Sequence, residues 1–205
     1  MPFVLRNRQI ESIDFEKITK TYNIKGFIVS HISQLEKLMP LKLELIGNFN
    51  LNIYNNYSIN KLKEFNISKF TASPELDKTE INNYQCNELK SEVIVYGKLP
   101  VMTNNYCYLG RSNRCYKECN QKCLNNSEFY LKDRMDFEFR IIPDNTFTIT
   151  TIYNSKTLSV ICDSINCDSV RIDILDENLD EIQNIINTVK SGNRFEGKDY
   201  TNGKF

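Results

Sequence analysis

Short apolar runs alternate with helical segments along most of the chain. The apolar runs have the length and composition of strands, and they cover residues 2–5, 26–32, 43–55, 69–76, 91–102 and 169–175. The segments between and after them predict helices at 15–23, 58–65, 77–84 and 177–192. Ser58 is the predicted N-cap of the second helix, and Lys190 with Gly192 closes the last one. Strands that alternate with helices form parallel βαβ units, so the sequence predicts an α/β fold with roughly six parallel strands.

The pattern changes after the fifth apolar run. Residues 137–155 are β-rich, with a turn at 143–145, and predict a hairpin. We therefore predict a single domain with a parallel part at residues 1–102 and 168–192. A cysteine-rich insertion occupies 103–167, and the polar tail at 193–205 is expected to be an exposed extension. Six strands are too few for a closed eight-stranded barrel, which usually takes about 250 residues.

Composition and charge limit the cellular compartment and the binding partners that we expect for this protein. Among the 205 residues, 26 basic and 26 acidic side chains give a net charge of zero, so no global basic field favours nucleic acid or a membrane. The sequence has neither a signal-peptide pattern nor eighteen consecutive apolar residues, so we expect no membrane span. A location in the reducing cytoplasm follows as an expectation. In that compartment, clustered cysteines are more often metal ligands or catalytic groups than disulfides.

Four of the seven cysteines lie within seventeen residues, at Cys107, Cys115, Cys119 and Cys123. The last three repeat every four residues and would share one face of a helix, and Gly110 lets the chain curl so that Cys107 can approach them. An odd number of cysteines fits a complete disulfide framework badly. Thiolates are the standard ligands of iron–sulfur clusters and of structural zinc. The segment therefore predicts a metal site, although zinc knuckles prefer paired C-x2-C hooks, which are absent from the sequence.

The segment from Glu92 to Cys107 resembles the signature of the collagenase-like peptidase U32 family, through Glu92-x-Ile94-x-x-Gly97-x-Leu99 and the cysteine that follows. Further similar segments occur in the same order, at residues 49–56, 71–81, 130–141, 150–155 and 197–205. Family members resemble TIM-type barrels. The resemblance thus implies an incomplete TIM-type barrel made of the later strands, and a chain that is a fragment, a split gene product or a degenerate paralogue.

The resemblance also implies an enzyme, with two alternative chemistries. The family is named for proteolysis, while its better-understood relatives are similar to oxygen-independent hydroxylation proteins that act on RNA bases or a quinone precursor. Those relatives carry iron–sulfur clusters on cysteines, which favours a 4Fe-4S cluster over zinc at the four clustered cysteines. Two positions depart from the family pattern, because Pro100 and Thr148 stand where relatives have cysteines. Cys115 or Cys162 would then have to supply a missing ligand.

The candidate catalytic residues are Glu75, Glu92 and His31, which lie at or near predicted strand ends. Catalytic groups of parallel barrels gather at the carboxyl ends of the strands. The alternatives are that Glu75 caps the following helix, that Glu92 pairs with a neighbouring lysine, and that His31 is a solvated loop residue. A single histidine gives no Ser-His-Asp arrangement, and the sequence contains no HExxH motif. A catalytic pair of Cys107 and His31 is possible, but Cys107 could then not serve as a metal ligand.

Two kinds of partner follow from the pattern. Five basic residues and one acid lie between Lys98 and Asn126, interleaved with Tyr106, Tyr108 and Tyr116, which could stack on RNA bases. The alternative is that this charge balances metal-bound thiolates.

A different class of function is a non-catalytic, zinc-stabilised binding module that docks RNA or another chain. Strands 2–5 and 170–175 are expected to have unpaired edges, so we also expect self-association or a partner chain that completes the barrel.

Overall fold

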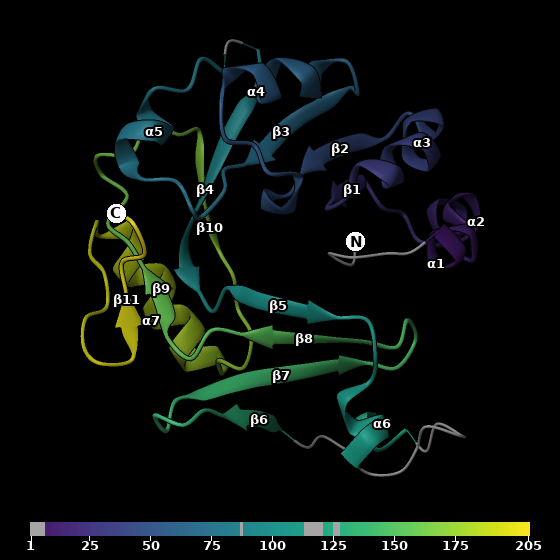
Figure 1. The fold of residues 1–205 in the computed structure, drawn as a ribbon. Coiled ribbons are helices and arrows are strands. Elements are labelled where there is room, and N and C mark those ends of the chain that lie inside the picture. The colour runs from purple at the N-terminus through teal and green to yellow at the C-terminus, as the bar shows by residue number, and fades with distance from the viewer. Residues whose placement is uncertain (1–6, 87, 113–120, 125–127) are drawn as a thin grey trace.

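The computed structural model describes residues 7–86, 88–112, 121–124 and 128–205. Its larger sheet contains five parallel strands in chain order, each beside the next: β1 (Gly26–Val29), β2 (Glu44–Gly47), β3 (Ile67–Thr71), β4 (Lys90–Gly97) and β10 (Ser169–Ile172). Figure 1 shows these strands in the upper half of the molecule. The predicted α/β class and parallel pairing are confirmed. The predicted strand at 2–5 lies outside the described residues.

Helices precede the first parallel strand, connect the strands and follow the last one. They are α1 (Asn7–Glu11), α2 (Phe15–Thr21), α3 (Leu35–Leu38), α4 (Asn56–Lys63), α5 (Lys78–Asn82) and α7 (Leu179–Lys190). The N-cap of α4 is Asn55, not Ser58, because the Asn55 side chain accepts a hydrogen bond from the Ser58 backbone N–H at 3.0 Å. Residues 49–51 form a 3-10 turn instead of prolonging β2, since Asn48 caps the turn and Asn52 ends it in the left-handed region.

Two hydrophobic clusters form the core. The first packs α2, α3 and α4 against β1–β3 and includes the fully buried Leu38, Ile59 and Phe70. The second surrounds Val93 and Val95 of β4 and includes Ile81 and Val189 from helices α5 and α7. Burying each large apolar side chain contributes about 1.5–3 kcal/mol, so the clusters hold the helices on one face of the sheet.

The other face of the parallel sheet, which we call the inner face, carries charged and polar side chains beside isoleucines. Thr71 pairs in register with Glu92, and Arg171 follows Ser169, the partner of Glu92. Because side chains alternate across a strand, Lys69, Thr71, Glu92 and Arg171 share this face. The Arg171 guanidinium reaches Asn48 at the end of β2, although β3 and β4 lie between the two strands. The sheet is therefore strongly curved, but β1 and β10 do not pair within the described ranges, and no closed barrel is formed there.

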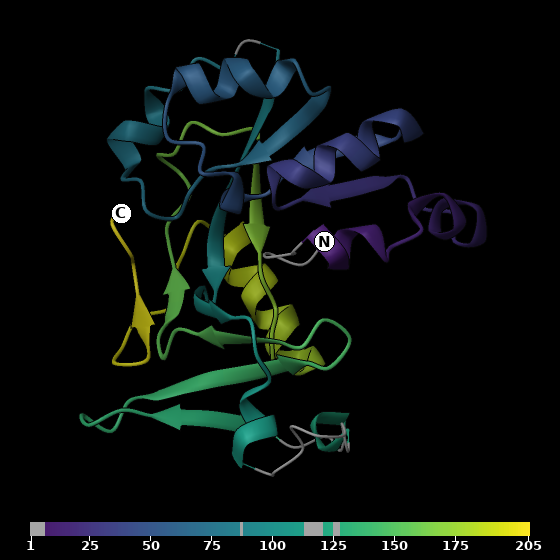
Figure 2. The same cartoon turned by 45° about the vertical axis from the view of Figure 1, so that its right-hand side comes forward.

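An antiparallel sheet lies between β4 and β10 in the sequence. Its spatial order is β5 (Pro100–Asn104), β8 (Ile149–Tyr153), β7 (Glu138–Asp144) and β6 (Phe129–Lys132). The predicted hairpin is β7–β8, but Pro143 and Asp144 still pair with β8, so the turn comes later than predicted. The predicted strand 91–102 is divided at Gly97, whose φ of 136° redirects the chain into β5. Figure 2 shows this sheet below the parallel strands.

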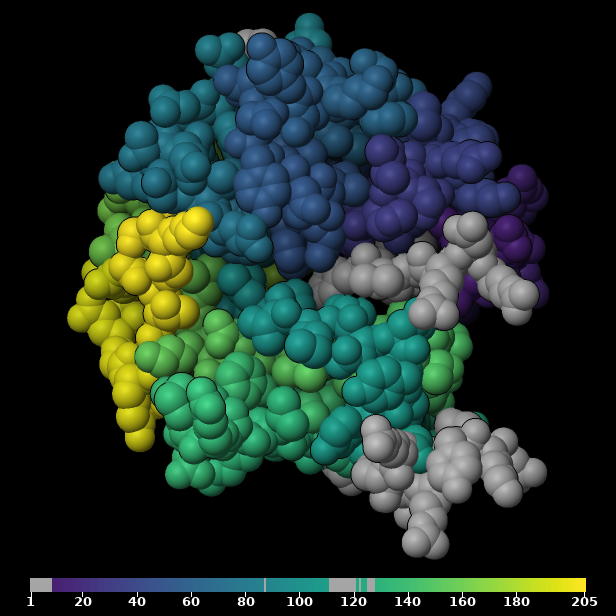
Figure 3. Space-filling view, viewed as in Figure 1, coloured from purple at the N-terminus to yellow at the C-terminus, as the bar shows by residue number. Residues whose placement is uncertain are grey.

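The carboxyl-terminal tail is not the exposed extension that its polarity predicts. Its strand β11 (Tyr200–Thr201) pairs with β9 (Thr157–Ser159), which itself pairs antiparallel with the end of β4. The Phe195 ring stacks on Tyr200 at 5.4 Å and meets Tyr96 edge-on at 5.8 Å. Three aromatic residues thus attach the tail to β4, and the tail runs along one side of the molecule (Figure 3).

Arg140 joins the antiparallel sheet to the segment after β10. Its guanidinium binds Asp176 through two hydrogen bonds, of 2.8 and 3.2 Å, and its side chain is only 11% exposed. It also donates to the backbone carbonyls of Phe129 and Ile141. Truncating one partner of a buried, bidentate arginine pair is strongly destabilising, because the other partner is left as an uncompensated buried charge.

We therefore expect Arg140→Ala to lower the free energy of unfolding by about 2–4 kcal/mol. The matched control is Lys132→Ala, which breaks an exposed ion pair with Asp136 on the same sheet and should change stability by less than about 0.5 kcal/mol. Urea denaturation followed by circular dichroism measures both. Equal effects for the two variants would show that Arg140 does not fasten the sheet.

Candidate functional site

Buried polar side chains gather where the parallel strands end. Ser30 follows β1 and Asn48 follows β2, and they are 1% and 2% exposed. The Asn48 amide donates to Ser30 Oγ at 3.0 Å, and its Oδ1 accepts from the Arg171 Nη1–H at 2.9 Å. Carboxyl ends of parallel strands are the usual place for functional groups in α/β folds. This network is therefore the strongest candidate binding site that the described residues form.

The backbone around this network is fixed by two further side chains. Gln34 is fully buried, and its Oε1 accepts from the Ser30 backbone N–H at 2.8 Å. Asp173 accepts from Arg171 Nε, while the Asp173 backbone N–H donates to the Tyr96 carbonyl at 2.9 Å. The Arg171–Asp173 pair is thereby anchored to β4.

Glu92 lies near the amino end of β4 on the inner face, several residues before the carboxyl end of the strand. It forms an ion pair with Lys69 on β3 and accepts a hydrogen bond from Thr71 Oγ1 at 3.0 Å. The Glu92 and Lys69 side chains are only 13% and 23% exposed. The pairing with a nearby lysine, one of the two interpretations open from the sequence, is present. This largely buried ion pair therefore lies on the same face of the sheet as Arg171.

Glu75 lies on the loop after β3 and is exposed. Its carboxylate accepts a hydrogen bond from the Tyr54 hydroxyl at 2.6 Å, and this bond raises the pKa of Tyr54 above its ordinary value. Glu75 does not cap α5, because Asp77 and Glu80 form the capping box of that helix. The loop therefore presents a tyrosine–carboxylate pair to solvent.

His31 follows β1 and is exposed. Its Nδ1 accepts from the Ser33 backbone N–H at 3.2 Å and lies 2.7 Å from Ser33 Oγ, so the ring caps a 3-10 turn at Ile32–Gln34. Among the described residues, the His31 ring is hydrogen-bonded to Ser33 alone, and no hydrogen bond joins it to a cysteine thiol or to a carboxylate. The imidazole therefore has a local structural partner, and the structure does not bring it to Cys107.

Two of the four predicted metal ligands, Cys107 and Cys123, lie among the described residues. Cys107 directly precedes α6 (Tyr108–Ser112), and Cys123 lies in the 3-10 turn Lys122–Leu124. Both side chains are half-buried, and neither is in a disulfide. Cys115 and Cys119 lie outside the described residues. In the part of the chain that is described, no group of three or more metal-ligating side chains is assembled, and Cys162 packs instead beside the second core cluster.

Thr150 of β8 holds the backbone on both sides of Cys107. Its hydroxyl accepts from the Tyr108 backbone N–H at 3.1 Å and donates to the Tyr106 carbonyl at 2.9 Å. Thr150 itself is 1% exposed, so this anchor is rigid. Thr150 thus fixes the backbone on both sides of Cys107.

Two of the remaining thiols are poor ligand candidates. Burial raises the pKa of Cys86 and of Cys167, which keeps both thiols protonated at neutral pH. In the predicted RNA-contacting segment, Tyr106 and Tyr108 are exposed. Tyr116 and the charged residues around it lie outside the described residues.

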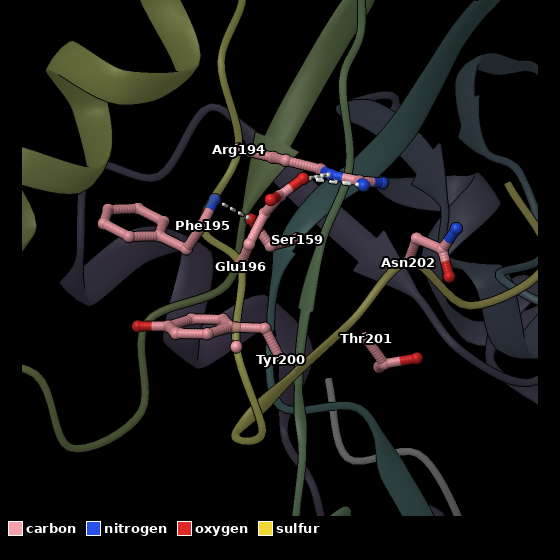
Figure 4. A pocket seen from close by; sticks show the side chains of 8 residues that line it. Ser159, Arg194, Phe195, Glu196, Tyr200, Thr201 and Asn202 are labelled. Atoms are coloured by element: carbon pink, nitrogen blue, oxygen red, sulfur yellow. Dashed lines mark hydrogen bonds and ion pairs between the residues drawn. The ribbon is translucent and has the colours of Figure 1, made fainter.

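Three cavities lie away from the Asn48–Arg171 network. One of about 330 Å³ lies in the tail, where Arg194 and Glu196 form an ion pair above Tyr200 (Figure 4). One of about 710 Å³ opens at the amino ends of β2, β3 and β4, beside Lys69. A third of about 470 Å³ lies between the antiparallel sheet and the tail and has Lys98, Lys156 and Lys198 in its wall. Each has charges of both signs among its lining residues.

The fold and site define a parallel α/β protein with charged and polar side chains on its inner face and a cysteine segment inserted after its fourth parallel strand. A family model described as peptidase family U32 matches residues 3–191. The chain therefore belongs to peptidase family U32. No curated protein and no solved structure matches the chain significantly. Within the described residues, no helix is long and apolar enough to cross a membrane.

Proposed function

We propose that the chain is an enzyme of the U32 type that uses a 4Fe-4S cluster for hydroxylation of an RNA base or a small molecule. In this proposal Cys107, Cys115, Cys119 and Cys123 hold the cluster. The observation that carries it is the anchoring of Cys107 by the buried Thr150, which presents an unbridged, half-buried thiol at a fixed position. Family membership adds support, because the peptidase U32 match includes this whole segment.

The donor set fits such a group. Cys107 and Cys123 lie on either side of the segment that contains the other two thiols, and neither is consumed by a disulfide. Four thiolates are the usual ligands of a 4Fe-4S cluster, which supplies one-electron chemistry when bound. The insertion leaves the parallel sheet at the carboxyl end of β4, the same end at which Asn48 and Arg171 meet.

The protein's own residues would bind and orient the substrate. Asn48 and Arg171 offer amide and guanidinium groups whose geometry is fixed by buried partners. Lys69 and Glu92 add a charge pair deeper on the same face. In this role they hold a polar group of the substrate and exclude bulk water from it.

Peptide hydrolysis is less well supported. The sole histidine, His31, caps a 3-10 turn, and its ring is hydrogen-bonded to Ser33 only two residues away, with no carboxylate partner among the residues described. Serine and cysteine proteases need a base that a third group orients toward the nucleophile. The family name alone therefore gives little reason to expect proteolysis by such a pair.

The alternative is a zinc-stabilised module without catalysis. The two departures from the family's cysteine pattern favour it, because neither Pro100 nor Thr148 offers a thiolate ligand. Anaerobic purification and visible absorption spectroscopy separate the two functions. A redox enzyme should give a visible band that dithionite bleaches, whereas a colourless protein with stoichiometric zinc would support the module.

We also propose self-association through the open edges of the parallel sheet. In the ranges described, β1 pairs only with β2, and β10 pairs only with β4. Exposed strand edges invite pairing with another chain, and Ile28 and Val170 on these strands are exposed. Sedimentation at micromolar concentration should therefore give dimers or larger species. A concentration-independent monomer would contradict this expectation.

A further inference from the structure

Two of the arginines that pair with a carboxylate, Arg140 and Arg171, use their other donors differently. Arg140 makes four hydrogen bonds, to both oxygens of Asp176 and to two backbone carbonyls. Arg171 makes two, from Nε to Asp173 and from Nη1 to Asn48, and no others with the described part of the chain. A guanidinium carries five N–H donors. Arg140 is therefore occupied as a structural residue, while the Nη2 edge of Arg171 has donors to spare.

The position of this edge is fixed by its neighbours. The Asn48 side chain is itself held, because it donates to Ser30 Oγ and its Oδ1 accepts from the Phe49 backbone N–H at 3.0 Å. Asp173 fixes the Nε side of the guanidinium. Side-chain exposure of Arg171 is 22%, so part of this side chain is open to solvent. A guanidinium oriented on two sides and open on the third is pre-organised for a ligand.

The nearby charges limit what this ligand can be. Lys69 and Glu92 neutralise each other on the inner face, and Asp173 offsets the charge of Arg171. The exposed donors point to an acceptor, and a planar fork matches the oxygens of a carboxylate or a phosphate. Because Asp173 reduces the net field, affinity for a simple anion should be modest.

We propose that the outer edge of Arg171 binds an oxyanion, the carboxylate or phosphate group of a ligand, at the carboxyl ends of β2 and β10. This proposal deepens the proposed function, on which it rests, because it assigns an anionic group to the substrate. Arg171 acts as the anchor, while Asn48 and Asp173 are positioning residues that hold the guanidinium.

The test uses the full chain, purified anaerobically, with its arginine side chains labelled with ¹⁵N. Sodium phosphate and sodium acetate are titrated separately at constant ionic strength, and the Nε–H signals of Arg171 and Arg140 are followed by NMR. We expect a saturable shift of the Arg171 signal and no shift for Arg140, which already makes four hydrogen bonds within the protein. The anion that binds more tightly identifies the source of the oxyanion.

Two variants separate an anion anchor from a structural ion pair. Arg171→Gln should weaken anion binding, followed through backbone amide signals near Asn48, by about tenfold or more. Asp173→Asn should strengthen it several-fold, because it removes a negative charge beside the anion, and a merely structural pair would not respond in this way. Thermal unfolding of each variant confirms that it is folded.

An Arg171 signal unchanged by both anions, or equal affinities of Arg171→Gln and the wild type, would overturn the proposal. Iron in the same sample is assayed independently of this titration. Absence of anion binding with iron present refutes only the Arg171 site. Anion binding without iron refutes only the cluster-dependent function.

Discussion

Replacing Gly97 by alanine should destabilise the protein by about 3 kcal/mol or more. Gly97 has a φ of 136°, and a Cβ there would overlap the Asp173 carbonyl oxygen and lie 2.8 Å from Asp173 Cβ. The substitution therefore combines backbone strain with a clash against the end of β10. Because Asp173 orients Arg171, the same change should also disturb the candidate binding site.

Gly197 provides a matched control for this prediction. Its φ of 129° is similar, but a Cβ at this position would have no atom within 4 Å. Gly197→Ala should thus cost only the strain, about 1 kcal/mol. Urea denaturation of both variants isolates the contribution of the clash. If Gly97→Ala cost no more than Gly197→Ala, the close approach of β4 and β10 would be incorrect.

Replacing Cys107 by serine should abolish stable cluster binding. A serine hydroxyl is a far weaker ligand than a thiolate, and the remaining three cysteines leave one iron without its protein ligand. We expect the iron content of Cys107→Ser, after anaerobic reconstitution, to fall to a small fraction of the wild-type value. Circular dichroism should show an unchanged fold, since Cys107 is only half-buried.

Cys86→Ser is the control for this substitution. Cys86 packs against the first core cluster, and burial raises its thiol pKa, so it is a poor metal ligand. This variant should keep its iron. Full iron content in Cys107→Ser, or an equal loss in Cys86→Ser, would show that Cys107 is not a ligand.

The sequence was sufficient to predict the parallel strands and the last helix. The apolar runs at 26–32, 91–102 and 169–175 each contain a parallel strand, because β-branched and aromatic residues are concentrated in them. Helix α7 was equally clear, since Asn178 and Glu181 form a capping box before a periodic apolar face. These features are local, and local propensities decide them.

The errors arose where distant contacts decide the structure. The tail looked polar and exposed, yet Phe195 and Tyr200 find their partners on β4 and β9, which no local pattern encodes. The N-cap of α4 was predicted at the wrong residue because both Asn55 and Ser58 are good capping residues. In the structure the helix begins after Asn55. The break at Gly97 was hidden within a continuous apolar run.

The candidate binding site was missed for the same reason. Asn48 and Arg171 are separated by 123 positions, and only the curvature of the sheet brings them together. A signal was present in the last strand, where Arg171 and Asp173 alternate with apolar residues and must therefore share a face. Charged residues at alternate positions of an otherwise apolar strand indicate a polar interior.

The most direct test of the central claim is the metal content of the full chain purified without oxygen. Iron, acid-labile sulfide and zinc are measured on the same sample and compared with protein concentration. A cluster held by the four clustered cysteines predicts about four iron atoms and four sulfides per chain, with little zinc. A protein that contains stoichiometric zinc, or no metal after anaerobic reconstitution with iron and sulfide, would contradict it.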